Sequence, residues 1–197
     1  MAACFLMTPL KHAIALTGSI ATGKSTAAAL LKLHGYRIID ADSISHQVLI
    51  DLADRVTAEL GTADRGELGM LVFEHPKKRK VLEGILHPEI RRRILAECEK
   101  LETLGVPYFV DIPLFFESGE AYPIDKTAVV YATETMQIER LIKSRHLTDE
   151  AARSRIAAQW PIEEKKSRAT WVIDNTGDIR HLTAQIDAFV RSLREMD

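Results

Sequence analysis

Cysteine is nearly absent from this chain of 197 residues, which contains only Cys4 and Cys98. Two cysteines do not make a disulfide framework, and neither lies at a metal-ligand spacing. Cys98 shares an apolar helical stripe with Ile90, Ile94 and Leu101, so we expect it to be a core residue rather than a nucleophile. The composition therefore excludes a small disulfide-stapled fold and fits a reducing, cytoplasmic environment.

A strong charge of one sign and long apolar runs are also missing. The formal net charge is −2, with 46% hydrophobic and 27% charged residues, which is the balance of a globular protein without a general attraction to nucleic acid or membranes. No run approaches the roughly 20 apolar residues of a membrane-spanning helix. The apolar residues 1–6 lack the basic start of a signal peptide. We therefore expect neither a nucleic-acid nor a membrane partner, and any anion site must be local.

The most informative segment is residues 18–25, which match the phosphate-binding loop pattern Gly-x-x-x-x-Gly-Lys-[Ser/Thr] in full. An apolar run of strand length precedes it at residues 13–17, and strong helix formers follow at residues 26–33. The glycines let backbone N–H groups point inward, and the start of the helix adds its positive dipole end. The pattern predicts a polyphosphate site; the alternative is a plain glycine-rich turn.

Lys24 and Ser25 carry the chemistry of this loop. Lys24 is placed to reach the β- and γ-phosphates of a nucleotide such as ATP, and the Ser25 hydroxyl is placed to hold Mg²⁺. We expect the donor nucleotide to contact the whole loop and the residue after it: Gly18, Ser19, Ile20, Ala21, Thr22, Gly23, Lys24, Ser25 and Thr26.

Five short β-rich runs alternate with helical segments, at residues 13–17, 36–39, 108–112, 128–131 and 171–173. This alternation predicts an α/β fold with a doubly wound parallel five-stranded sheet flanked by helices. Residues 44–104 contain no convincing strand; helices broken at 61–69, Pro76 and Pro88 predict an inserted helical lobe. With Pro88 at a first helical position, His87 is a boundary residue, either a plain cap or a side chain that faces a cleft.

Acidic residues end two of these strands. Asp40 and Asp42 follow the second run and Asp111 ends the third, and ligands of open α/β sheets bind at the carboxyl ends of strands. Asp111 has the position of a Walker-B-like carboxylate that holds Mg²⁺ directly or through water. The alternatives are local: Asp42 or Ser43 caps the next helix, and Asp111 caps its own turn.

Basic residues crowd the helical stretch between the last two strands. Arg140 lies on a polar stripe beside an apolar helix face, and Arg145 and Lys165 are among the cations that follow. Phosphoryl transfer uses such cations, brought by a closing segment, to stabilise charge on the moving group. The alternative for any one of them is a surface charge balanced by neighbouring acids.

Taken in order, these motifs resemble the dephospho-CoA kinase family, the ATP-dependent enzymes that finish coenzyme A synthesis. The resemblance runs almost end to end. Its carriers are Leu16-Thr17-Gly18 with the loop, Ile39-Asp40-Ala41-Asp42, Leu86-His87-Pro88, Ile112-Pro113-Leu114-Phe115-Phe116-Glu117, Gln137 with Arg140-Leu141 and Arg145, Gln159, and Val172-Ile173-Asp174-Asn175-x-Gly177.

The resemblance implies transfer of the γ-phosphate of ATP, with Mg²⁺, to the 3′-hydroxyl of dephospho-CoA. It also implies one kinase domain over residues 1–197, monomeric or weakly homo-oligomeric. We place its nucleotide core at about 11–43, 105–135 and 170–197, its helical CoA-binding lobe at about 44–104 and its lid at about 140–169.

The resemblance assigns roles to single residues. Asp42 would orient the acceptor hydroxyl and take its proton, and His87 would face the acceptor pocket. Pro113 and Leu114 would also contact the acceptor. The roles at the donor are these: Lys24 and Arg140 as catalytic cations, Arg145 as a phosphate contact of the lid, and Asn175 and Gly177 as the adenine-side turn.

The chain departs from the family pattern at four places, one of which is Thr170, which follows Ala169 before the last strand where aspartate is often found. Ser19 and Ala21 stand where glycine is usual, and the loop tolerates them only if their backbones avoid positive φ. Trp160 stands where methionine is usual, after Gln159. The segment 47–73 is shorter than usual, which affects the expected acceptor pocket most.

Two other functions compete with this interpretation. A shikimate-like or nucleoside monophosphate kinase shares the loop and an Asp-x-Asp after the second strand, but not the later motifs. A GTP-dependent switch protein would need an Asn-Lys-x-Asp motif, which the sequence lacks.

Overall fold

The computed structural model describes residues 9–118 and 122–195, so Cys4 and the apolar start of the chain lie outside the described residues. The described chain divides into two units. One holds the residues up to Ile38 and from Leu101 onward, and the other is Ile39–Lys100. The chain passes from the first unit to the second within strand β2 (Ile38–Asp40).

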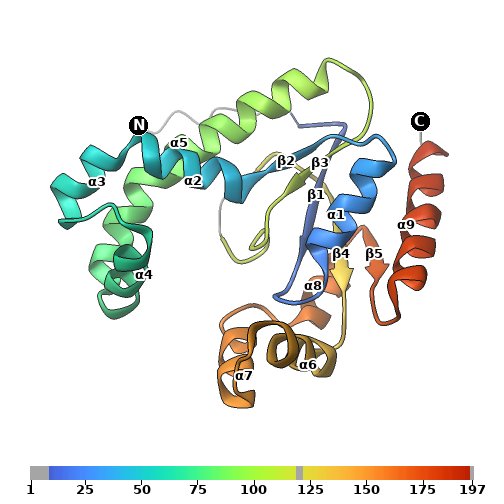
Figure 1. Cartoon of the computed structure of the whole chain (residues 1–197). Helices are drawn as coiled ribbons and strands as arrows, with labels where there is room; N and C mark the ends of the chain where they lie inside the picture. Colours follow the sequence, from blue (N-terminus) through green and yellow to red (C-terminus); the bar gives the residue numbers. More distant parts are fainter. Residues whose placement is uncertain (1–8, 119–121, 196–197) are drawn as a thin grey trace. The chain divides into compact units, whose positions relative to one another are not determined.

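Five strands form one sheet in the order β2-β3-β1-β4-β5 (Figure 1). The central strand β1 (Ala13–Gly18) pairs in parallel with β3 (Tyr108–Asp111) on one side and with β4 (Lys126–Tyr131) on the other. Strand β4 pairs in parallel with β5 (Trp171–Asp174). The predicted fold class, a doubly wound parallel sheet, is confirmed.

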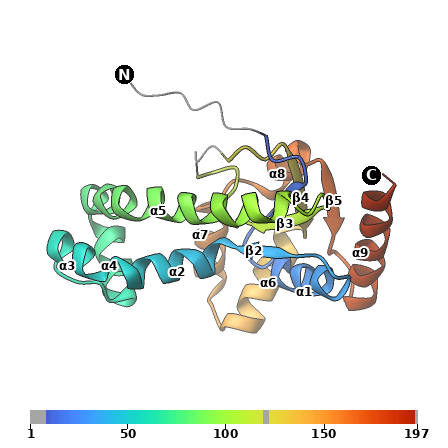
Figure 2. The ribbon, with the colours of Figure 1, turned by 90° about the horizontal axis from the view of Figure 1, so that it is seen from above.

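Alternate residues of β4 enter different cores, as the period of a strand requires. Ala128 and Val130 pack in one cluster with residues of α1 (Lys24–Leu33) and α9 (Ile179–Arg194). These two helices lie side by side in both ribbon views (Figures 1 and 2). Val129 and Tyr131 instead pack against Ile162 of α8 (Ile162–Arg168). Helices therefore cover both faces of the sheet.

Helix α9 holds its face of the sheet through one apolar stripe. Leu182, Ile186 and Phe189 are buried there, as the spacing of the apolar residues predicts. Burial of a side chain of this size contributes about 1.5–3 kcal/mol. The N-cap of α9 is Asp178, whose carboxylate accepts a hydrogen bond from the His181 N–H at 2.9 Å.

The phosphate-binding loop follows β1 directly. Because β1 has neighbours on both sides and the chain returns to them from opposite directions, its carboxyl end lies at the switch point where α/β sheets bind ligands. The remaining helices of this unit, between β4 and β5 in the chain, are α6 (Glu134–Arg145), α7 (Asp149–Ala157) and α8.

The second unit is built from helices around a core of its own. Val48, Val56, Leu60, Leu68 and Ile85 are buried together there. Its helices are α2 (Ala41–Asp51), α3 (Ala53–Leu60), α4 (Arg65–Glu74) and α5 (Pro76–Glu102). Among its described residues no strand follows β2.

The predicted break at residues 61–69 is too long. Helix α4 already begins at Arg65, so Gly66 and Gly69 lie inside it. The Asp64 side chain caps this helix by accepting hydrogen bonds from the N–H groups of Gly66 and Glu67, at 2.9 and 3.0 Å. A good N-cap is worth about 1 kcal/mol, which offsets much of the cost of the two glycines.

The predicted break at Pro88 is wrong, because α5 continues through this residue. His87 is therefore not a boundary residue but lies in the helix interior. A proline inside a helix removes one backbone hydrogen bond and costs about 3 kcal/mol. Apolar residues on both sides of Pro88 are buried, with Ile85 and Leu86 before it and Ile94 and Cys98 after it. Their burial outweighs the cost of the proline, and the predicted core position of Cys98 is confirmed.

Among the described residues, no helix combines the length and the apolar character that a bilayer crossing requires.

An ionic cluster links two helices of the second unit. Glu89 accepts hydrogen bonds from Arg92 at 2.8 and 2.7 Å and from Arg93 at 2.7 Å, and Arg93 also donates to Asp51 at 2.6 Å. Hydrogen bonds from Arg92 and Arg93 lower the pKa of the Glu89 carboxyl from 4.5 to about 2, although desolvation opposes them. The arginines at 92 and 93 are therefore held in place rather than freely solvated.

Replacement of Glu89 by Gln should destabilise the protein at neutral pH and not at very low pH. The folded-state pKa is lowered, so the carboxylate stabilises the fold above pH 4.5, and this contribution is lost as the pH falls toward 2. Denaturant unfolding of wild type and Glu89→Gln between pH 7 and pH 2 would measure the difference. The difference should be constant above pH 5 and vanish near pH 2, whereas Glu99→Gln, exposed on the same helix, should show no such convergence.

Candidate functional site

Two positions of the loop accept only glycine, because a side chain there would clash with neighbouring atoms. A Cβ atom on Gly18 would lie 2.7 Å from Thr22 Oγ1 and 2.9 Å from the Val130 carbonyl oxygen. Gly23 is the N-cap of α1 with φ +91°, and a Cβ there would lie 2.1 Å from Asn175 Nδ2. Both glycines of the motif thus allow other groups to approach the loop backbone closely.

The loop carbonyls are held from outside by side chains. The Ser19 carbonyl accepts from Thr22 N at 3.2 Å and Thr22 Oγ1 at 2.9 Å. Arg140 Nη1 donates to the carbonyls of Ala21 and Thr22 at 3.2 and 3.3 Å. Asn175 Nδ2 donates to the Thr22 carbonyl at 2.7 Å. With the carbonyls turned outward, the N–H groups are left for an anion.

Within the described part of the chain, four of these N–H groups have no protein acceptor: those of Ala21, Gly23, Lys24 and Ser25. Backbone donors without a partner are unusual in folded proteins unless a ligand or water satisfies them. They lie at the N-terminus of α1, where the helix dipole favours negative charge. The loop is therefore a preformed cradle for phosphate oxygens.

Lys24 and Asp111 form an ion pair at the loop. Their side chains are 18% and 14% exposed, so the pair is largely shielded from water. Lys24 comes from the first residue of α1, and Asp111 from the last residue of β3, the neighbour of β1. The structure thus brings together the two residues that the sequence placed at the phosphates and at the metal.

Ser25 and Asp111 supply the donor atoms that Mg²⁺ prefers. The Ser25 side chain is exposed beside the loop, and Asp111 provides a carboxylate. Mg²⁺ is typically held by one or two protein oxygens together with substrate phosphates and water. No group of three or more His, Cys, Asp or Glu side chains suited to a metal occurs among residues 9–118 and 122–195. The two residues fit a metal carried largely by the nucleotide.

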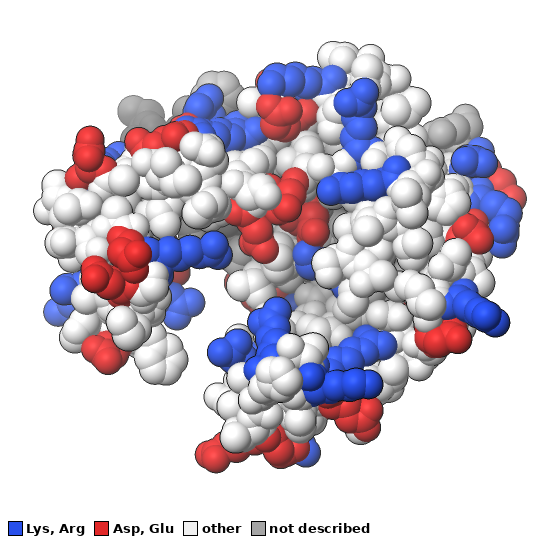
Figure 3. Space-filling model, in the orientation of Figure 1, with Lys and Arg blue, Asp and Glu red and all other residues white. Residues whose placement is uncertain are grey.

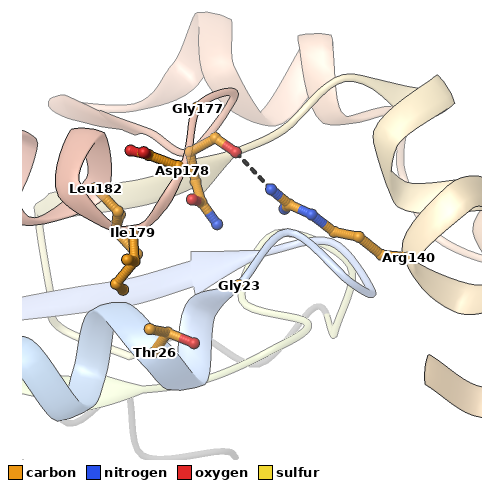
Figure 4. Close-up of a pocket in the computed structure, with 8 residues that line it drawn as sticks. Gly23, Thr26, Arg140, Gly177, Asp178, Ile179 and Leu182 are labelled. Carbon is orange, nitrogen blue, oxygen red and sulfur yellow. Dashed lines mark hydrogen bonds between the residues drawn. The ribbon is translucent and has the colours of Figure 1, made fainter. Parts of the chain in front are cut away.

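A pocket of about 280 Å³ opens beside the loop (Figure 4). Arg140 reaches into it from α6 and donates through Nη2 to the Asn175 carbonyl at 2.8 Å. Ile179 and Leu182 give the pocket an apolar wall. Its lining residues are Gly23, Thr26, Arg140, Asn175, Gly177, Asp178, Ile179 and Leu182.

The turn after β5 is tightly built. A Cβ on Gly177 would lie 2.6 Å from His181 Cβ and 2.7 Å from its Cγ. The Asp174 carboxylate accepts from Thr176 N at 2.8 Å. Burial raises the pKa of Asp174, but hydrogen bonds from Thr176 and the charges of His181 and Lys166 lower it, so the net shift is downward. The turn is thus fixed at the mouth of the pocket.

Helices α6 and α7 pack against each other through Ile138, Leu141 and Ala152, and the loop residues Ile20 and Ala21 pack on this cluster. Figure 3 shows Lys and Arg side chains gathered over these helices. Arg145 is exposed in the last turn of α6. Of the two predicted cations on α6, Arg140 thus lies on the loop, and Arg145 lies at the exposed end of the helix.

The segment after β3 carries two predicted acceptor contacts. Thr17 Oγ1 donates to the Pro113 carbonyl at 3.1 Å, which ties the segment to β1. Leu114 is 42% exposed. Three further residues near the loop were not predicted as site residues: Glu117, Gln159 and Lys165.

Lys165 is completely buried, so the alternative that it is a surface charge is wrong. Its spacing gives the signal that could have identified it. Lys165 lies three residues after the buried Ile162, on the same side of a short helix. A lysine at a core position of a helix requires a polar partner, which the chain supplies from distant segments.

Asp42 and His87 belong to the second unit. Asp42 is exposed in the first turn of α2, but the cap of this helix is Asp40, which accepts from Ser43 N at 3.0 Å. The alternative that Asp42 or Ser43 is the N-cap is therefore wrong, because the N-cap is Asp40 and the helix begins at Ala41. This leaves the Asp42 carboxylate available for another role.

A hollow of about 540 Å³ lies in the same unit, between α2 and α5. One of its lining residues, Ser43, directly follows Asp42 in the sequence. Its lining residues are Ser43, Ile44, Gln47, Arg92, Arg93, Ala96 and Glu97.

The model of the family described as "Dephospho-CoA kinase" matches residues 12–181. The dephospho-CoA kinase of Sulfurimonas denitrificans is 47% identical over 191 residues, covering 93% of this chain and 95% of that protein. That of Wolinella succinogenes is 42% identical and covers 96% and 98%. Over nearly its whole length, the chain is thus similar to proteins of one named activity.

Two solved structures are similar in fold and sequence. TT1252 from Thermus thermophilus has a TM-score of 0.80 at 35% identity, covering 95% of this chain and 99% of that one. Dephospho-CoA kinase from Campylobacter jejuni has a TM-score of 0.75 at 32% identity, covering 92% and 96%.

Ala21 should tolerate glycine and reject a β-branched residue. Its φ is +62°, so the expectation that this backbone avoids positive φ is wrong; the left-handed region costs an L-residue roughly 1–2 kcal/mol. Ala21→Gly relieves this strain and should keep ATP affinity within about threefold. Ala21→Val should lose at least about tenfold, because a β-branched residue is a strong outlier there. Calorimetric titration with ATP would measure both, with Ala29→Val on the exposed face of α1 as the control; equal affinity of Ala21→Val and wild type would contradict the prediction.

Gly177→Ala should disturb the pocket, because the added methyl group meets the base of the His181 side chain rather than its flexible end. We expect a lower melting temperature and at least about tenfold weaker ATP binding, measured by thermal unfolding and calorimetry. Gly84→Ala is the matched control, since nothing lies within 4 Å of a Cβ at this helical position. It should raise stability by about 0.5–1 kcal/mol. A Gly177→Ala protein as stable as wild type, with normal ATP affinity, would refute the clash.

Proposed function

The chain belongs to the dephospho-CoA kinase family, and from this premise we propose that it transfers the γ-phosphate of ATP to the 3′-hydroxyl of dephospho-CoA. The observation that carries the proposal is the loop at residues 18–25. Its carbonyls are bound by side chains, the N–H groups of Ala21, Gly23, Lys24 and Ser25 have no protein acceptor among the described residues, and Lys24 lies beside Asp111. This arrangement is suited to bind the phosphate groups of the phosphoryl donor.

On the donor side, the loop N–H groups and Lys24 hold the phosphates. Arg140 adds a second cation next to the loop, and Asn175 and Gly177 border the pocket that we assign to the adenine. Ser25 and Asp111 would hold the Mg²⁺ that accompanies ATP, and the metal would neutralise charge on the β- and γ-phosphates. Arg145 would approach the phosphates when the lid closes.

On the acceptor side, we assign binding to the second unit and to the segment after β3. The hollow between α2 and α5 includes Ser43, the residue after Asp42, and the guanidinium groups of Arg92 and Arg93 in its lining, paired with Glu89 and Asp51, would contact an anionic acceptor. Asp42 would orient the 3′-hydroxyl and accept its proton. His87, Pro113 and Leu114 would complete the acceptor contacts.

The transition state of phosphoryl transfer is loose in most analyses, so positioning and charge neutralisation supply most of the rate. Lys24 and Arg140 stabilise the charge on the transferred group, and both are held by partners before the reaction begins. A base adds less, because the hydroxyl need not be fully deprotonated. Loss of Lys24 should therefore cost more than loss of Asp42.

The proposal extends to the organisation of the protein. Residues 44–104 serve as the CoA-binding lobe and 140–169 as the lid of the core at 11–43, 105–135 and 170–197. We place the enzyme in the cytoplasm, as a monomer or weak homo-oligomer without nucleic-acid or membrane partners.

The acceptor decides between this function and that of a related kinase. Purified protein with ATP and Mg²⁺ should release ADP with dephospho-CoA and produce coenzyme A. Shikimate, nucleoside monophosphates and a reaction without acceptor serve as comparisons and should give no more than background. Turnover with one of these instead, and none with dephospho-CoA, would overturn the proposal.

Lys24→Ala and Asp42→Asn should separate the donor and acceptor roles. We expect Lys24→Ala to lower kcat by about 10²–10³-fold, the usual loss on removing a group that stabilises transition-state charge. Asp42→Asn should lower kcat by about tenfold or more and leave ATP affinity unchanged. Asp54→Asn, exposed in the first turn of the next helix, is the control and should behave as wild type. Full kcat in Asp42→Asn would exclude Asp42 as the base.

A further inference from the structure

Lys165 is a fully buried lysine at the outer side of the phosphate loop. Its Nζ donates to the carbonyl oxygen of Gly18 at 3.1 Å and pairs with Glu117 Oε1 at 2.5 Å. Lys165 comes from α8, Gly18 from the end of β1, and Glu117 from the segment after β3. One ammonium group therefore joins three segments that are far apart in the sequence.

The energetics of this pair do not favour a purely stabilising role. Burial of two charges carries a large desolvation penalty, and a well-packed apolar pair is often as stable or more so. Glu117 Oε2 is buried without a hydrogen-bond partner among the described residues, so the carboxylate is not fully satisfied. A costly and incompletely satisfied pair indicates that its geometry serves another purpose.

Neighbouring contacts fix the same part of the loop. Gln159 Oε1 accepts from the Ile20 N–H at 2.8 Å, and the Trp160 N–H donates to Glu117 Oε1 at 3.1 Å. The Trp160 ring stacks on Phe116, with centroids 6.4 Å apart and planes at 11°. The segment that begins at Gln159 and ends at Lys165 thus holds residues 18–20 of the loop from outside.

We propose that Lys165 is a positioning residue for phosphate binding, acting through the Gly18 carbonyl. Gly18 is the only loop residue whose carbonyl is held by a buried charge among the described contacts. The ammonium fixes this carbonyl dipole on the outer side of the loop, so its negative end cannot turn toward the phosphates. Glu117 balances the buried charge and ties it to the segment that carries Pro113 and Leu114.

The inference rests on the proposed function only in that the loop binds the phosphates of ATP. It predicts that ATP affinity depends on Lys165 itself and not on the intact ion pair. Glu117→Gln keeps the contact between Lys165 and Gly18, whereas Lys165→Met removes it. The double variant Lys165→Met/Glu117→Gln removes both charges and leaves no unpaired buried carboxylate, so it should be more stable than Lys165→Met.

The test is ATP·Mg²⁺ binding by calorimetry together with thermal unfolding of the four proteins. Lys165→Met and the double variant should both bind ATP about 10- to 100-fold more weakly, the usual loss on removing a hydrogen bond to a charged group. Glu117→Gln should bind within about threefold of wild type, even where its melting temperature falls. Lys166→Met, one residue along α8 where the side chain lies over the Tyr131 ring, is the matched control and should keep wild-type affinity.

Two results would overturn the proposal. Wild-type ATP affinity in the double variant would show that the Gly18 carbonyl needs no support. If Glu117→Gln and Lys165→Met lost ATP affinity equally, each in proportion to its loss of stability, the ion pair would have a purely structural role. Binding measurements keep the two proposals distinct, because a protein that binds ATP in this way but does not phosphorylate dephospho-CoA would refute the proposed function and leave the role of Lys165 intact.

Discussion

The loop at residues 18–25 depends on one constraint: its carbonyls must be satisfied on the outside so that its N–H groups can face inward. A backbone carries equal numbers of donors and acceptors, and an anion site can use only the donors. Each outward carbonyl therefore needs a donor from elsewhere. Arg140, Asn175, Thr22 and Lys165 supply these donors. The conformation of the phosphate site is therefore fixed by hydrogen bonds to the loop carbonyls, on the side that faces away from the bound anion.

This constraint explains why the donors come from distant segments. Arg140 lies on α6, Asn175 follows β5, and Lys165 lies on α8, and all three segments follow β4 in the chain. The parallel order β1-β4-β5 places the carboxyl ends of these strands next to each other. The fold thus gathers the supporting side chains at the carboxyl ends of these strands, and Gly23 leaves room for Asn175 and Arg140.

Local patterns predicted most of the fold, because strands and the loop leave short-range signals. The five strands, helix α9 and the phosphate loop follow from apolar periodicity and from one motif. The errors arise where tertiary packing outweighs a local rule. Helix α5 passes through Pro88 because residues on both sides of it are buried, and Ala21 adopts a positive φ inside a loop held by many contacts. Lys165 was missed because its partners, Gly18 and Glu117, are 147 and 48 positions away in sequence.

The requirement that a buried polar group has a partner applies also to the charges of Lys24 and Asp111, which form an ion pair. Both side chains are largely shielded, so either charge alone would be costly. When Lys24 turns to the phosphates, as the proposed function requires, Asp111 loses its ion pair with Lys24. A Mg²⁺ ion bound with the nucleotide would supply a new counter-charge to the Asp111 carboxylate, while the phosphates would pair with the Lys24 ammonium. On the proposed function, this exchange of partners would make the binding of ATP and the binding of Mg²⁺ mutually dependent, since each ligand would take one member of the ion pair.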